Sequence, residues 1–143
     1  MSVFASLRTA TLSIPRTTGA TVSIRGLSPR ALEAAQKEHQ RQALQAMREA
    51  REAGGEDALG QVDPAAVQAY LDEQRRNPLL AYDAESLVVK GVTAWTLELP
   101  HTAESVAELD EDVRDYIATE ILKLSKPSLF RTVEEQEADQ KEA

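Results

Sequence analysis

The sequence predicts an α+β fold that is mainly α-helical, with an N-terminal β-hairpin over 1–27, a small helical domain over 28–130 and an acidic C-terminal tail over 131–143. Three observations support this prediction. Apolar residues alternate with Ser and Thr in the first 25 residues, which is the period of a strand. From residue 28 onward they recur at helical spacing, between Gly and Pro residues that end each helix. The final segment is mostly charged, and we expect it to be disordered.

The hairpin is expected to have strands over 7–14 and 21–25. Four apolar residues alternate with hydroxyl residues in them, namely Leu12, Ile14, Val22 and Ile24. Between the strands, Pro15, Thr18 and Gly19 are typical turn residues. An isolated two-stranded ribbon is marginal in water, so we expect the hairpin to pack on helices or to pair with another chain. Because the segment is rich in Ser, Thr and Arg and lacks acids, a transit peptide is the alternative interpretation, although such peptides are helically periodic.

A long first helix is expected from Ser28 to about Ala53. Ser28 suits the N-cap, and Pro29 suits the first turn because no amide donor is lost there. Its apolar face is thin and consists of Leu32, Ala35, Ala43, Leu44, Met47 and Ala50. Such a helix is either largely solvated or contacts another subunit. Residues 54–62, which follow it, are expected to be a flexible connector.

Two further helices are expected in the middle of the chain. Asp63 and Pro64 open the first, which carries Val67, Tyr70 and Leu71 on one face and ends at Asn77–Pro78. Asp83 caps the second, which is apolar on nearly all sides and supplies the predicted core residues Leu87, Val88, Val92 and Trp95. Gly91 lowers its helical propensity, which suggests that a neighbouring backbone packs closely there. The β-branched residues leave a strand as the alternative.

The last part of the helical domain is expected to begin with an extended segment over 97–100. Thr102 can cap a short turn, and Asp110 can cap a final helix over 111–124 that Pro127 ends. The predicted core stripe of this helix is Val113, Ile117, Ile121 and Leu124.

The charge is distributed unevenly along the chain. The net charge is −8, but residues 1–32 contain four arginines and no acid, so that segment carries +4 and the other 111 residues carry −12. An acidic body argues against a nucleic-acid partner. No apolar run reaches the roughly 18–20 residues that a membrane-spanning helix needs, so no membrane partner is expected either.

No residue pattern typical of catalysis, cofactor binding or metal binding is present. The chain has no cysteine, and neither His39 nor His101 has a second histidine at ligand spacing. Gly54–Gly55 lacks the following Lys-Ser or Lys-Thr of a phosphate-binding loop. We therefore expect no catalytic residues, no cofactor and no metal. An enzyme with an unrecognised carboxylate site is the least favoured alternative.

The remaining features indicate protein–protein interaction. A hairpin can offer an unpaired strand edge, and the Leu129–Phe130 pair lies at the base of the acidic tail. The candidate partner-binding residues are Leu12, Ile14, Arg16, Val22, Ile24, Arg25, Leu129 and Phe130. The alternative for each is ordinary packing within the monomer.

Three stretches of the sequence resemble a known family. The hairpin followed by "VSIRGLSPRALEAAQKEH", and later "ESLVVKGVTAWTLE" and "AELDEDVRDYIATEILKLSKPSLF", resemble the tail-assembly chaperones of long-tailed, siphophage-type bacteriophages. The resemblance covers roughly residues 10–130 except 54–78. It implies a homo-oligomeric protein of the bacterial host cytoplasm, absent from the mature virion, whose partners are the tape-measure protein and the tail-tube protein.

Two other functions are compatible with the sequence. A virion structural protein, such as a head–tail connector or a tail-completion protein, would share the α+β build and the oligomerising hairpin. A small prophage-encoded regulatory or adaptor protein is the further alternative.

Overall fold

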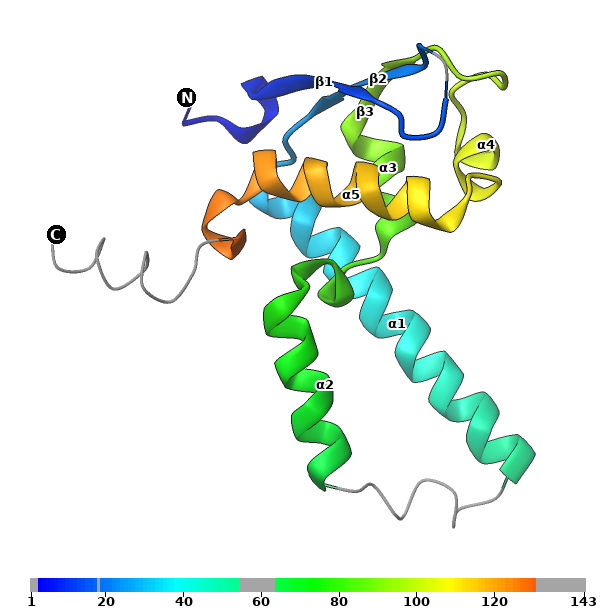
Figure 1. The fold of residues 1–143 in the computed structure, drawn as a ribbon. Coiled ribbons are helices and arrows are strands. Elements are labelled where there is room, and N and C mark those ends of the chain that lie inside the picture. The colour runs from blue at the N-terminus through cyan, green and yellow to red at the C-terminus, as the bar shows by residue number, and fades with distance from the viewer. Residues whose placement is uncertain (1–2, 18, 55–63, 131–143) are drawn as a thin grey trace, which may run out of the picture.

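The computed structural model describes residues 3–17, 19–54 and 64–130, and it confirms a mainly helical fold with a small antiparallel sheet near the N-terminus (Figure 1). In chain order the elements are η1 (Ala5–Leu7), β1 (Thr9–Ser13), β2 (Thr21–Arg25), α1 (Pro29–Gly54), α2 (Pro64–Arg76), η3 (Pro78–Ala81), α3 (Ala84–Gly91), β3 (Val92–Trp95), α4 (Ala103–Ala107), α5 (Glu111–Ser125) and η4 (Pro127–Phe130). The predicted tail over 131–143 and most of the predicted connector lie outside the described residues.

The sheet has three antiparallel strands in the order β1–β2–β3. The predicted hairpin is confirmed, with Leu12 opposite Val22 and the turn glycine Gly19 at a φ of +78°. The predicted third helix is correct only as far as Gly91, because Val92 to Trp95 form β3 and pair with β2. The β-branched residues Val92 and Thr93 suit a strand, and β2 offers the hydrogen bonds that a helix would otherwise have supplied.

Gly91 ends α3 at a point of close packing. A Cβ atom there would lie 2.6 to 2.9 Å from three side-chain carbons of Ile121 on α5. Only glycine lets the two helices approach this closely. The predicted close approach is therefore present, although the neighbour is a side chain and not a backbone.

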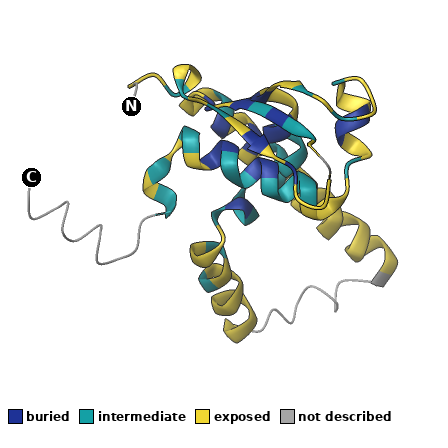
Figure 2. Ribbon diagram, turned by 45° about the horizontal axis from the view of Figure 1, so that its top comes forward, coloured by how far each residue is buried: buried dark blue, intermediate teal, exposed yellow. Residues whose placement is uncertain are grey.

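The core lies between the inner face of the sheet, α3, α5 and the first turns of α1 (Figure 2). Its fully buried side chains are Val22, Ile24, Leu87, Val88, Val106, Ile117, Ile121 and Leu122. Among the predicted core residues, Leu87, Val88, Val92, Ile117 and Ile121 are buried, while Trp95, Val113 and Leu124 are partly buried against the same cluster. We refer to this part of the molecule, without the outer parts of α1 and α2, as the body.

Most predicted helix ends agree with the structure. Ser28, Asp83 and Thr102 accept backbone hydrogen bonds at the starts of α1, α3 and α4. Asp110, predicted as the cap of α5, makes no such side-chain bond. The segment over 97–100, predicted as extended, is a series of bends, because the indole of Trp95 donates a hydrogen bond to the Leu99 carbonyl and draws the chain back.

None of the described helices is both long enough and apolar enough to cross a membrane.

Candidate partner-binding site

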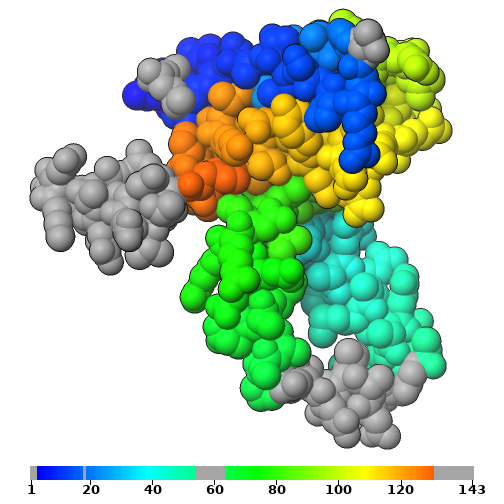
Figure 3. All heavy atoms as spheres, viewed as in Figure 1, coloured from blue at the N-terminus to red at the C-terminus, as the bar shows by residue number. Residues whose placement is uncertain are grey.

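The outer parts of α1 and α2 form a projection that we call the arm, defined as residues 40–53 of α1 together with α2. Leu32 and Ala35 bury the first turns of α1 in the core. From Gln40 to Ala53 every residue is exposed, and α2 contains no buried residue. Figures 1 and 3 show both helices leaving the body, with an opening between them farther out. The arm therefore adds surface to the molecule without adding to its core.

Both helices of the arm carry apolar side chains that the chain itself leaves in solvent. Leu44 and Met47 on α1 are 56% and 50% exposed, and Val67, Tyr70 and Leu71 on α2 are 43% to 46% exposed. An amphipathic helix normally buries such a face against another element. These five residues are the largest apolar surplus that the described part of α1 and α2 offers to a partner.

The arm is also close to electrically neutral. Residues 40–53 of α1 contain three basic and two acidic residues, and α2 contains two of each, whereas the whole chain carries −8. Two of these basic residues pair along their own helix, namely Arg75 with Asp72 at 3.8 Å and Arg41 with Glu38 of the preceding turn at 2.6 Å. An apolar partner therefore meets little net charge on the arm.

A small hollow of about 270 Å³ separates α1 from α2 near the base of the arm. Its lining is Gln36, His39, Gln40 and Ala43 from α1, Tyr70 and Gln74 from α2, and Ala81. Amide, imidazole and phenol groups of this kind can exchange hydrogen bonds with the polar side of an incoming helix. In the described residues, no group of three or more His, Cys, Asp or Glu side chains could hold a metal ion, and His39 lies among neutral neighbours in this hollow.

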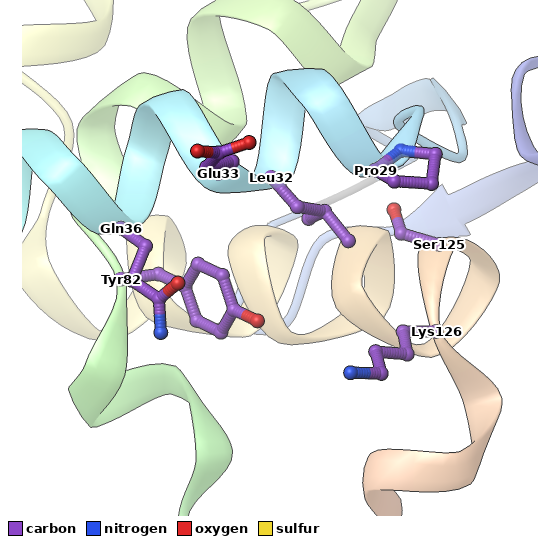
Figure 4. A pocket seen from close by; sticks show the side chains of 7 residues that line it. All are labelled: Pro29, Leu32, Glu33, Gln36, Tyr82, Ser125 and Lys126. Carbon is purple, nitrogen blue, oxygen red and sulfur yellow. The ribbon is translucent and has the colours of Figure 1, made fainter.

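A second hollow, of about 360 Å³, lies where the arm joins the body (Figure 4). It is lined from α1 by Pro29, Leu32, Glu33 and Gln36, from the connection before α3 by Tyr82, and from the end of α5 by Ser125 and Lys126. Burial raises the pKa of the Tyr82 phenol, which favours its protonated form. Ser125 is already used in structure, since its hydroxyl accepts from Leu27 N and donates to Ile121 O.

The hairpin side chains predicted to bind a partner are not available for binding. Leu12, Ile14, Val22 and Ile24 are buried in the core of the chain itself, because α3 and α5 cover the inner face of the sheet. That part of the prediction is wrong. The backbone of β1 remains an edge strand, with pairing on the β2 side alone among the described residues.

The other four predicted partner-binding residues lie at or near the surface. Arg16 is exposed in the turn at a φ of +65°, and Arg25 is exposed with its Nε donating to the Lys90 carbonyl at 3.3 Å. Leu129 and Phe130 are partly buried in η4, and Lys123 Nζ lies 5.8 Å from the centre of the Phe130 ring. Arg16 and Arg25 belong to the hairpin, whereas Leu129 and Phe130 lie on η4 after α5.

The sequence indicates an unburied apolar face for only one of the two helices of the arm. The thin apolar face of α1 and the face of α2 were both recognised, but neither was assigned as a binding site. In α1 the apolar residues are too sparse for a core helix, and this sparseness indicates a face that the monomer does not bury. In α2 no such indication exists, because Val67, Tyr70 and Leu71 have the same spacing as an ordinary buried face.

Comparison of the chain with protein-family models, with curated proteins and with solved structures finds no match.

Proposed function

We propose that this protein is a non-catalytic tail-assembly chaperone of long-tailed bacteriophages, which holds apolar helices of the tape-measure protein in solution in the host cytoplasm and recruits tail-tube subunits. The observation that supports the proposal is the arm. Two projecting helices carry five large apolar side chains that are between 43% and 56% exposed. The resemblance of the sequence to this family supplies the identity of the partner.

The geometry suits a helix as the occupant. An amphipathic helix that lies along α1 and α2 would cover Leu44, Met47, Val67 and Leu71 with its own apolar face. Covering these side chains would stabilise the complex, because each square ångström of apolar surface removed from water contributes about 25 cal/mol to the free energy of binding. The net charge of −8 on the whole chain would keep the complex soluble by repulsion between copies.

Co-expression with the tape-measure protein of the same phage tests the proposal. We expect the chain to move that protein from the insoluble to the soluble fraction. The double variant Leu44→Glu/Leu71→Glu should lose this effect, because it places charge on both apolar faces of the arm. Ala46→Glu is the matched control, since Ala46 is exposed on the side of α1 opposite Leu44 and should leave solubilisation intact.

Two results would count against the proposal. One is a tape-measure protein that stays insoluble beside a well-folded chain. The other is the chain itself in purified virions at stoichiometric amounts by mass spectrometry, which would favour the virion structural protein.

A further inference from the structure

A second apolar surface is lined by residues of β3, the bends that follow it, the end of α4 and the start of α5. These elements lie on the body, away from the arm (Figure 1). It is a hollow of about 440 Å³, which is within the range of small ligand sites. Four apolar side chains line it, namely Trp95, Leu97, Leu99 and Leu109. We call this surface the acidic cup, because three carboxylates lie at the same hollow.

The aromatic wall of the acidic cup is held in place by its own contacts. The Trp95 Nε1 donates to the Leu99 carbonyl at 2.8 Å, and the His101 ring packs against the indole at 4.9 Å between centroids with an interplanar angle of 66°. The indole nevertheless stays partly exposed, and Leu99 is 48% exposed. A side chain already fixed in one position loses little entropy when a ligand covers it.

The carboxylates of the acidic cup form no ion pair within the part of the chain that the structure describes. Glu98, Glu108 and Asp110 line the hollow, and none of them forms an ion pair with a described residue. Arg114 is the only Lys or Arg between positions 98 and 115, and it is occupied by Glu111 at 3.8 Å and Asp115 at 3.0 Å. The hollow therefore combines apolar walls with carboxylates that form no ion pair among the described residues, and a basic side chain from another segment, Arg16 of the hairpin turn, lines an adjacent hollow with Asp110.

We propose that the acidic cup docks a short basic segment of a partner protein, in which an aliphatic side chain is flanked by arginines. The aliphatic group would enter between Leu97 and Leu99, and one guanidinium would lie on the face of Trp95. A second guanidinium would form charge-assisted hydrogen bonds with Glu108 and Asp110. Acidic peptides, nucleic acids and anionic membranes carry the same sign of charge as the cup and are disfavoured.

The tryptophan in the acidic cup supplies a direct measurement, because it is the only one in the chain. The probe is the peptide acetyl-Arg-Leu-Arg-Leu-Arg-amide, titrated into the full chain while Trp95 fluorescence is recorded. We expect a saturable change that weakens as salt is added. A peptide with glutamate in place of arginine, and one with serine in place of leucine, should produce no saturable change.

Two charge-reversal variants distinguish the acidic cup from general attraction to an acidic protein. Glu108→Lys should weaken binding of the arginine–leucine peptide about tenfold, since a like charge then faces the guanidinium. Glu104→Lys should weaken it less than about twofold, because Glu104 lies in the first turn of α4, whose C-cap is Glu108, is exposed and does not line the cup. Both sites are exposed, so both variants should fold, which circular dichroism checks.

Three outcomes would overturn the proposal. They are the absence of any saturable change with the arginine–leucine peptide, an equal loss in the two lysine variants, and a fluorescence change that depends on protein concentration alone. The last would mean that a second copy of the chain covers Trp95.

Discussion

Helices α5 and α2 have similar lengths and similar apolar stripes, but they differ in how far these stripes are buried. Helix α5 buries Ile117, Ala118, Ile121 and Leu122 against the sheet and α3. Helix α2 buries nothing, and its Val67, Tyr70 and Leu71 stay in contact with water. The comparison shows that an apolar stripe predicts a helix with one face to be buried. Which element packs against that face depends on where the helix lies in the fold.

The body and the arm also differ in the interactions that stabilise them. The body is stabilised by a shared core in which eight large side chains are almost completely buried. The arm relies on its attachment at Leu32 and Ala35 and on local pairs along each helix, such as Glu38 with Arg41 at 2.6 Å. Exposed pairs of this kind contribute only a few tenths of a kcal/mol each. We therefore expect the body, and not the arm, to determine the global stability.

The largest difference between the two regions is expected in the free energy of unfolding when one apolar side chain of each is shortened to alanine. Ile121→Ala should lower the free energy of unfolding by about 2–5 kcal/mol, because Ile121 is fully buried between Gly91 and the core. Leu44→Ala in the arm should change it by less than about 0.5 kcal/mol. Urea unfolding followed by circular dichroism measures both. A comparable loss at Leu44 would mean that the arm is already covered in the free protein.

A smaller effect is expected where the arm joins the body. Asp83 caps α3 by accepting from Ser86 N at 3.2 Å, and its own N–H donates to the Ala35 carbonyl of α1 at 3.1 Å. Asp83→Ala should cost about 1 kcal/mol of stability through the lost cap. Asp110→Ala is the matched control and should cost only about 0.3 kcal/mol through the helix dipole, since Asp110 makes no cap bond. Equal losses at both sites, in thermal unfolding, would contradict this assignment.

The smallest expected effect concerns the solvated side of α1. The Arg41 guanidinium donates two hydrogen bonds to the Glu38 carboxylate and, with Gln42, lowers the pKa of Glu38 from 4.5 to about 2. Because the folded-state pKa is the lower one, this pair stabilises the helix above the ordinary glutamate pKa, and its contribution disappears as the pH falls toward 2.

An NMR pH titration of the Glu38 carboxyl measures this shift directly. Arg41→Gln should return the pKa of Glu38 toward 4.5 and leave the melting temperature almost unchanged, because the pair is exposed. A titration of wild-type Glu38 in the ordinary glutamate range would show that the two side chains do not stay together in solution.

Local sequence signals were sufficient for most of the fold. Ser28 with Pro29, Asn77 with Pro78, and Pro127 mark helix ends whose cause lies within a few residues, so they could be read without knowledge of the neighbours. The alternation of Leu12, Ile14, Val22 and Ile24 likewise identified two strands and the side that they bury. It did not identify what buries them, and for that reason the same residues were wrongly assigned to a partner.

The sequence by itself determined the mainly helical class, the hairpin and the residue types of the core, because propensity, capping and periodicity act over one or two turns of chain. Only the tertiary structure decided that Val92 to Trp95 leave the helix, since β2 supplies the strand to which they pair. It also decided that α5 is covered while α2 is not, and that Trp95 meets Glu98, Glu108 and Asp110 in one hollow. These outcomes depend on contacts between segments far apart in the chain, which no local pattern records.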